Sequence, residues 1–294
     1  VGPEPRSHDR VGLGVARELA VRLQSTVRFE PTEPLRSGDA PFPVANESDD
    51  CLIYSATEIA LGRQSPLPSD LTAPLRVAGY ATDNVVVAVT NLVNLEIGQP
   101  VHAFDADRIE GTLRIRLSHS GERAWLLGEP APRELPGGIL VIADDNKILA
   151  IAGVIGCEES RVIGSTRRIL LESGTFDAVA VRKAARALAV QTDASARFER
   201  AGDPALPLVA AARVVDLLRT YAGVTVPGES YYGGKWKNPG RVINLSSFLL
   251  SRWLGREFDV AEIHARLTAY GFTVESESQD LMRVQVPTWR LWDV

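Results

Sequence analysis

The sequence predicts an α+β protein, in which a domain with a mixed or antiparallel sheet and packed helices is followed by a small winged-helix-like domain. Three observations support this class. Short apolar runs separated by Gly, Asp and Pro turns predict strands between residues 51 and 152. Two helical patterns follow, at 178–190 and 207–221. After residue 240 the order is helix–helix–strand–strand, which is typical of a winged-helix-like module.

The N-terminal segment, residues 1–46, begins with an amphipathic helix. Apolar residues from Leu13 to Leu23 recur at spacings of three and four, with Arg and Glu on the opposite face. The pattern ends before Pro31, and the run to Asn46 is rich in proline and has no periodicity. We expect this run to be a linker or an extended arm.

Residues 47–225 form the larger predicted domain. The expected strands are 52–58, 85–89, 113–117, 124–127, 139–143 and 148–152. Asp177 is the candidate N-cap of the helix over 178–190. Pro207 near the start and Gly223 just past the end bound the second helix.

A linker and a small domain complete the chain. Residues 226–240 are rich in Gly, Pro and Tyr, which predicts a domain boundary there. The small domain, residues 241–294, is expected to contain the helices and strands 243–255, 261–271, 273–277 and 282–286.

Composition limits the function. The net charge of −5 and the pI near 5.5 exclude a generally basic nucleic-acid coat, although a local patch can still bind RNA. No apolar run reaches the roughly 18 residues of a membrane span. Two cysteines, Cys51 and Cys157, predict reduced thiols in a cytosolic protein. The chain begins with Val1, which is neither an initiator methionine nor the start of a signal peptide, so we expect that it is not the first residue of the gene product.

The densest polar cluster runs from Thr90 and Asn91 to residues 98–105. Gly98 and Pro100 predict a bend, which places His102 just past it and outside a regular element. Polar groups that follow an apolar strand are typical of a small-molecule pocket. The alternative is that His102 bonds its neighbours and packs.

Three further features each have two interpretations. Glu172 follows three apolar residues and either points outward or is buried with a partner, in which case it is a functional candidate. The small residues of 150–156 indicate either close packing or a phosphate loop. The charged segment 192–200 is either a capped loop with exposed ion pairs or the wall of a pocket. Neither a Ser-His-Asp spacing nor a metal-binding histidine pair is present.

Taken in order, these motifs resemble the β subunit of bacterial phenylalanine–tRNA ligase. The matching segments are 89–91, 98–105, 150–156, 169–173 and 192–204. Residues 14–20 (GVARELA) resemble the family's GIARELA helix, and 287–290 (PTWR) with Asp293 resembles its PSWR…D signature. The resemblance therefore covers nearly the whole chain.

The resemblance implies that residues 47–225 are an editing domain, which hydrolyses tyrosine wrongly attached to the phenylalanine tRNA. It places in the editing pocket the catalytic residues Thr90, Asn91, His102 and Glu172 and the substrate-binding residues Ala152, Gly153 and Ala194. Glu172 would recognise the phenol hydroxyl, and His102 would assist from the neighbouring wall. Backbone amides near Ala152 and Gly153 are expected to donate to the oxyanion. None of these residues is an obvious strong general base.

The chain also departs from the family pattern. It has Ala81 where the family has Arg, Ala88 where it has Asp, Leu92 where it has Tyr, Asn94 where it prefers an apolar residue, and Cys157 where it has Gly. These differences predict an altered substrate orientation or amino-acid preference.

Several parts of the family's β subunit have no counterpart here. They are the oligonucleotide-binding insert, the catalytic-like domain and the C-terminal anticodon-binding domain. Asp293 matches the first residue of an acidic metal cluster whose other members would lie beyond Val294, and no other metal site is predicted. The chain is therefore expected to be a central fragment of a longer β subunit or a trimmed paralogue.

The first functional hypothesis is a cytoplasmic aminoacyl-tRNA ester hydrolase. Its expected partners are tRNA, an aromatic amino acid and the ligase α subunit, with neither DNA nor membrane. No cofactor is expected in this segment, since ATP and Mg would belong to the full ligase. A basic face for tRNA would come from Arg182, Arg186, Arg197 and Arg200. The pattern favours the alternative that these four are solvated helix and loop charges that do not contact tRNA.

Two alternatives remain open. One is a non-catalytic module that binds tRNA or an amino acid, or that assembles subunits, with a decayed pocket. The other is a paralogue recruited to transfer or sense a modified aromatic amino acid.

Overall fold

The computed structural model describes residues 12–27, 35–38, 42–276, 278 and 280–294. The chain forms two compact units, of which the larger is Glu30–Trp236 and the smaller combines Val1–Phe29 with Lys237–Val294. The predicted separate segment 1–46 differs from this division, because its helix belongs to the smaller unit.

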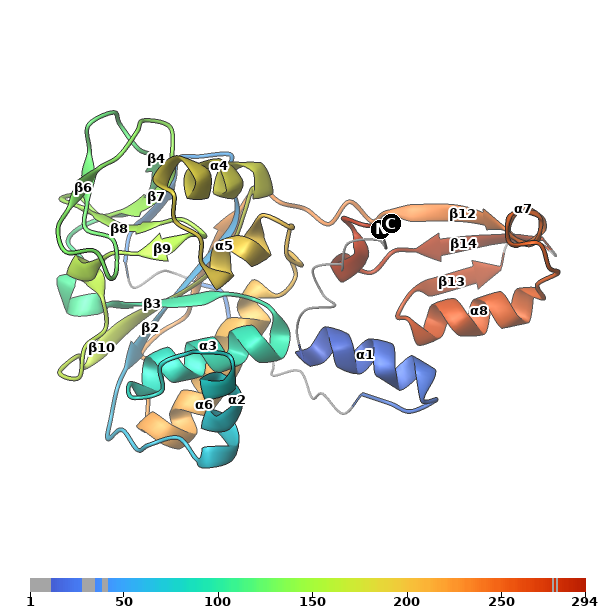
Figure 1. Cartoon of the computed structure of the whole chain (residues 1–294), viewed down its shortest axis with the longest axis horizontal. Coiled ribbons are helices and arrows are strands. Elements are labelled where there is room, and N and C mark those ends of the chain that lie inside the picture. The colour runs from blue at the N-terminus through green and yellow to red at the C-terminus, as the bar shows by residue number, and fades with distance from the viewer. Residues whose placement is uncertain (1–11, 28–34, 39–41, 277, 279) are drawn as a thin grey trace. The chain divides into compact units, whose positions relative to one another are not determined.

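Two main sheets form the larger unit (Figure 1). The five-stranded sheet has the order β1-β4-β7-β8-β9, with β1 Val44–Asn46, β4 Leu113–Leu117, β7 Leu140–Ala143, β8 Ile148–Ile151 and β9 Ile155–Gly156. The four-stranded sheet has the order β11-β2-β10-β3, with β11 Tyr231–Gly234, β2 Cys51–Ala60, β10 Arg168–Phe176 and β3 Val101–Asp105. Neighbouring strands are antiparallel, except that β1 pairs with β4 in parallel. The predicted mixed and antiparallel α+β class is confirmed.

The helices of the larger unit are α2 Ser69–Val77, α3 Val85–Ile97, α4 Ala178–Leu188, α5 Asp193–Phe198 and α6 Pro207–Ala222, with short 3₁₀ turns η2 Ala106–Arg108 and η3 Glu158–Ser160. Helices α3 and α6 pack on each other and on the four-stranded sheet. Leu170 of β10 belongs to the apolar layer between the two sheets. Side chains alternate along a strand, so its buried neighbours Ile169 and Leu171 point to the face that the helices cover.

Two predicted helices form as expected. The side chain of Asp177 accepts hydrogen bonds from the amides of Val179 and Ala180 and thereby caps α4. Helix α6 begins at Pro207 and ends at Gly223, whose φ of 54° is the left-handed conformation that glycine adopts without strain.

The predicted strand 85–89 is wrong, because these residues form the first turns of α3. The Asn84 side chain accepts hydrogen bonds from the amides of Val86 and Val87, and Gly98 ends the helix with a φ of 90°. β-Branched residues favour strands only weakly, and burial against the sheet and α6 overrides that preference. The predicted strand 124–127 is also shorter, since only β5 (Arg123–Ala124) forms, paired with β6 (Arg133–Glu134).

The smaller unit contains a three-stranded antiparallel sheet of order β12-β14-β13. Its elements are α1 Gly12–Arg22, β12 Val242–Ser246, α7 Ser247–Leu254, α8 Val260–Ala269, β13 Thr273–Ser276, β14 Leu281–Gln285 and η4 Thr288–Arg290. The predicted helix 243–255 is therefore wrong over 243–246, which belong to β12, and α7 follows directly. The Arg17 guanidinium lies 4.2 Å from the centre of the Trp289 ring, which links α1 to the end of the chain.

Candidate active site

Four of the seven predicted site residues line one cavity of about 90 Å³ in the larger unit. They are His102, Gly153, Glu172 and Ala194. The remaining lining residues are mostly apolar: Pro100, Val101, Ile142, Ala150, Ile151, Val154, Ile155, Gly156, Phe176 and Phe198. The wall comes from β3 and β10 of one sheet, from β7, β8 and β9 of the other, and from α5. The cavity is thus lined by both sheets and by α5.

Glu172 is the central polar group of this cavity. It sits in the middle of β10, opposite His102 of β3 on one side and Ala56 of β2 on the other. The residue is 6% exposed, and its carboxyl group has no hydrogen-bond partner among the described residues. Burial raises the pKa of Glu172 to about 8, so the group is mostly protonated at neutral pH. Of the two interpretations, outward-pointing or buried with a partner, the buried position of Glu172 is confirmed, and the expected partner is not found among the described residues.

His102 lies on the neighbouring strand rather than outside a regular element, which corrects the prediction. It is the second residue of β3, and its ring packs edge-on against Phe104 with centres 4.6 Å apart. Its Nε2 atom is buried without a partner among the described residues. Burial lowers the pKa of His102 to about 4, so the imidazole is neutral at pH 7.

Gly156 makes the room for that imidazole. A Cβ atom at this position would lie 2.6 Å from Cε1 and 2.7 Å from Nε2 of His102, closer than van der Waals contact allows. The small-residue segment 150–156 therefore serves close packing beside the polar pair.

Gly153 has a similar role on the other side of the cavity. Its φ is 69°, and a Cβ atom there would lie 3.1 Å from the rings of both Phe176 and Phe198. These two rings meet edge-on at 5.3 Å. Ala152 does not line the cavity, and its amide already donates to the Leu140 carbonyl at 3.0 Å. The expected oxyanion donor at Ala152 is therefore occupied.

Thr90 and Asn91 are not among the residues that line the cavity. Both lie on α3, and the Thr90 hydroxyl donates to the Val87 carbonyl within the same helix at 2.9 Å. The strand prediction for 85–89 had implied that they follow a strand end. Because the segment is a helix, they belong to the layer that covers the other face of the sheet.

Sequence reasoning missed Phe176 and Phe198 as wall residues. Phe176 lies four residues after Glu172 in the same strand, and period-two alternation is the signal that could have placed them on one face. Phe198 lies four residues after Ala194 in α5, which is the spacing that places two side chains on one face of a helix. Both signals require knowing which element each residue belongs to.

Three of the four arginines considered for a tRNA-binding face already have partners. Arg182 donates to the Glu199 carbonyl at 2.8 Å, Arg197 pairs with Asp193, and Arg200 pairs with Glu199. The segment 192–200 thus combines both earlier interpretations, because it is a capped helix with ion pairs and also supplies a wall of the cavity.

The part of the chain that the structure describes has neither a metal cluster nor a membrane-spanning helix. No group of three His, Cys, Asp or Glu side chains there is arranged to hold a metal ion. The Asp293 carboxylate instead accepts from Nε of Arg290 at 2.9 Å. None of the described helices is long and apolar enough to cross a membrane.

Comparisons with known proteins show what the chain resembles. The B3/4 domain family matches residues 51–223. The phenylalanine–tRNA ligase β subunit of Gloeobacter violaceus is 38% identical over 288 residues, which is 96% of this chain and 36% of that protein. The same subunit of Cutibacterium acnes is 36% identical over 94% of this chain and 33% of its own length. This chain therefore spans about a third of the length of these relatives.

Solved structures are also similar to this chain. One of them is an N-terminal fragment of the phenylalanyl-tRNA synthetase β subunit from Pyrococcus horikoshii, with a TM-score of 0.46 and 14% identity. The match covers 98% of this chain and 80% of that one.

Proposed function

Because the chain belongs to the B3/4 domain family and is similar to phenylalanine–tRNA ligase β subunits over about a third of their length, we propose that it hydrolyses tyrosine esterified to the phenylalanine tRNA. The observation that supports this most is Glu172, a buried carboxyl group that faces an apolar cavity and has no hydrogen-bond partner in the described part of the chain. A side chain with a phenol hydroxyl can satisfy that group, whereas phenylalanine leaves it unpaired.

The neutral state of Glu172 suits this recognition. A protonated carboxyl group both donates through its hydroxyl and accepts at its carbonyl oxygen, and a phenol offers the complementary pair. A site built around such a group rejects the analogue that lacks the hydroxyl by a factor on the order of 10⁴. Its buried polar atoms would otherwise lose hydrogen bonds to water without replacement.

The ester itself needs little activation. An aminoacyl ester is reactive, so the site's task is to hold a water molecule and the ester carbonyl in the orientation needed for attack. His102 is neutral, and its unpaired Nε2 can bond a water molecule or the substrate beside Glu172. With a pKa near 4 it is a weak base, which favours a positioning role over proton abstraction.

The size of the cavity imposes one condition. Its volume of about 90 Å³ is below the roughly 150 Å³ of an apolar cavity that holds a benzene ring. An aromatic side chain therefore enters only if part of the wall moves outward.

The substrate carrier, the partner subunit and the compartment are proposed from the same similarity to ligase β subunits. The relatives are named phenylalanine–tRNA ligase β subunits, which supports tRNA as the substrate carrier and an α subunit as partner. We propose the cytoplasm as the place of action. ATP and Mg would serve aminoacylation elsewhere in such a ligase, and ester hydrolysis in this segment uses no cofactor.

The proposal is tested by following deacylation of the phenylalanine tRNA charged with either tyrosine or phenylalanine. We expect tyrosine to be released and phenylalanine to be retained. Glu172→Ala should slow tyrosine release about a hundredfold. Glu172→Gln should release tyrosine at a rate within about tenfold of the original chain, because glutamine preserves one donor and one acceptor.

The exposed Glu134 of β6 provides a matched control, since Glu134→Ala removes a carboxylate outside the cavity. Equal release of both amino acids, or an unchanged rate in Glu172→Ala, would contradict the proposal.

A non-catalytic binding module is the second candidate. The position of Thr90 and Asn91 on α3, away from the cavity lining, favours it. It predicts that the chain binds tyrosine or charged tRNA with measurable affinity but without release of the amino acid.

A further inference from the structure

Helix α5 closes one side of the cavity, and it is too short to be stable by its own hydrogen bonds. It has six residues, Asp193–Phe198, of which Ala194 and Phe198 line the cavity. Its position therefore depends on contacts with other elements. Those contacts in turn set the size of the cavity.

One contact ties α5 to the opposite wall. Thr192 is the N-cap of the helix and accepts a hydrogen bond from the Ser195 amide at 3.1 Å. Its hydroxyl donates to the carbonyl of Val154, a lining residue, at 2.7 Å. The start of α5 is thereby fixed to the loop between β8 and β9.

A second contact ties α5 to α3 and to the segment that precedes it. Oδ2 of Asp193 accepts hydrogen bonds from the Tyr80 hydroxyl and, at 3.0 Å, from Nδ2 of Asn94. It also accepts from Nε and Nη2 of Arg197 at 3.2 and 3.1 Å, one turn along α5 itself. The connection to other elements therefore comes from Tyr80 and Asn94. We call Tyr80, Asn94 and Asp193 the α5 latch.

The anchor side of the latch is firmly held. Asn94 belongs to α3, which is capped at both ends and packs against α6 and β3. Its side chain is 6% exposed on a helix whose other buried residues are mainly apolar. A buried amide costs stability unless it is hydrogen-bonded. Here Nδ2 of Asn94 donates to Asp193, and Oδ1 is buried without a partner among the described residues, so the bond to Asp193 is the one that holds this side chain.

We propose that Tyr80 and Asn94, acting through Asp193, are positioning residues that limit the size of the aromatic ring admitted beside Glu172. The latch holds α5, and with it Ala194 and Phe198, against the cavity. Weakening it allows α5 to move outward and a ring with a larger para substituent to enter. This inference rests on the proposed ester hydrolysis at the same cavity.

The test compares two substrates on the same tRNA, tyrosine and O-methyltyrosine, in the full chain and in Tyr80→Phe and Asn94→Ala. Each variant should raise the kcat/KM ratio of O-methyltyrosyl to tyrosyl ester about fivefold, the effect of one lost hydrogen bond. The gain should come from a lower KM for O-methyltyrosyl ester. The kcat for tyrosyl ester should stay within about twofold, because the groups beside the ester are unchanged.

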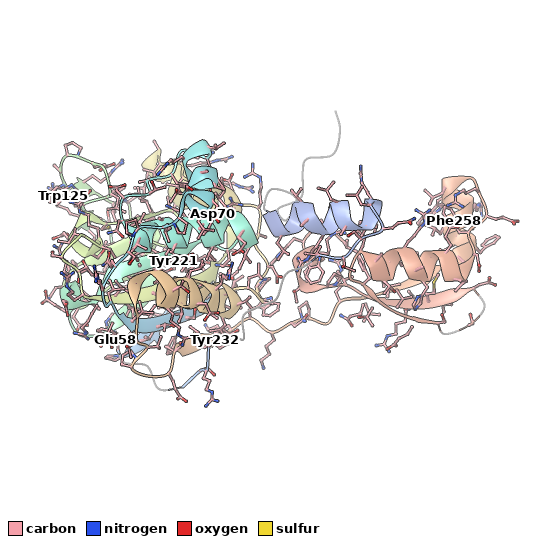
Figure 2. All side chains as sticks on the ribbon, turned by 90° about the horizontal axis from the view of Figure 1, so that it is seen from below. Glu58, Asp70, Trp125, Tyr221, Tyr232 and Phe258 are labelled. Atoms are coloured by element: carbon pink, nitrogen blue, oxygen red, sulfur yellow. The ribbon has the colours of Figure 1, made fainter. Side chains whose placement is uncertain are left out.

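Tyr232 of β11 offers the matched control (Figure 2). It is exposed, and its hydroxyl has no hydrogen-bond partner among the described residues, so Tyr232→Phe removes the same atom without touching the latch. Tyr232→Phe should leave the substrate ratio unchanged.

The outcomes separate the two proposals. Tyrosine release by the original chain with an unchanged ratio in both folded variants overturns the latch and leaves the proposed function standing. If Tyr80→Phe fails to fold, the kcat/KM ratio of O-methyltyrosyl to tyrosyl ester in Asn94→Ala decides. If both variants fail to fold, these residues support the whole fold rather than position α5, and the proposal is overturned. Absence of release by the original chain overturns the proposed function first, and the latch with it.

Discussion

Two buried carboxyl groups of the larger unit have opposite surroundings. Asp144, in the turn between β7 and β8, accepts hydrogen bonds from the amides of Glu110, Asn146 and Lys147 and from Nζ of Lys147, at 2.8–3.0 Å. Glu172 has no partner among the described residues. Both are nearly inaccessible, at 3% and 6% exposure.

Their ionisation differs accordingly. Burial alone would raise the pKa of Asp144, but the bonds from Lys147 and the backbone hold it below its usual value. Burial of Glu172 is uncompensated and raises its pKa to about 8. A buried carboxylate with every oxygen bonded stabilises the fold, whereas one left without partners costs stability and is available to a ligand.

The largest expected effect is on the partnered group. Asp144→Ala leaves buried amide donors and the Lys147 ammonium without their acceptor, so we expect a loss of about 3 kcal/mol in the free energy of unfolding. Urea unfolding followed by circular dichroism measures it. Asp145→Ala, in the same turn but half exposed, should cost under about 1 kcal/mol. Equal losses would contradict the contrast between the two groups.

The unpartnered group should instead make stability depend on pH. Glu172 titrates near its ordinary 4.5 in the unfolded chain and near 8 in the folded one, so between these values the folded state holds the additional proton. Stability therefore falls as pH rises through this window and levels off above it. His102 has the opposite effect between about 4 and 6.5, because burial lowers its pKa.

The measurement is the difference in unfolding free energy between the original chain and Glu172→Gln. Glutamine does not titrate, so this difference isolates Glu172 while His102 is common to both proteins. From about pH 5.5 to pH 8 the unfolding free energy of the original chain should fall, relative to that of Glu172→Gln, by up to about 1.4 kcal/mol per pH unit. A constant difference across this range would show that Glu172 is not a buried neutral acid.

The sequence predicted those features of the fold that depend on neighbouring residues, and it failed where tertiary contacts decide. Helix caps at Asp177 and Gly223 follow local rules, and both were predicted correctly. The run 85–89 was assigned to a strand because its β-branched residues favour one. Its burial against α6 and the sheet, which no local pattern reveals, makes it a helix.

The candidate site was predictable where composition alone marks a residue. A carboxyl group within an apolar run identified Glu172, and its cross-strand neighbour His102 followed from the family resemblance. The wall residues Phe176 and Phe198, and the contacts of Tyr80 and Asn94 with Asp193, join segments far apart in the chain. Such contacts depend on the tertiary fold, so single-sequence patterns do not contain them.

The smallest expected effect concerns a third buried group, Tyr54, which lies on β2 beside Glu172 in the same layer between the sheets. Its hydroxyl is fully buried without a partner among the described residues. Tyr54→Phe removes an unsatisfied group, so we expect unfolding free energy to stay unchanged or to rise by less than about 1 kcal/mol. Ser55→Ala is the matched control, because the Ser55 hydroxyl donates to the Ser173 carbonyl at 2.7 Å and its loss should cost about 1 kcal/mol. A loss in Tyr54→Phe as large as in Ser55→Ala would mean that the Tyr54 hydroxyl is satisfied by buried water, which would extend the polar site from Glu172 into the core.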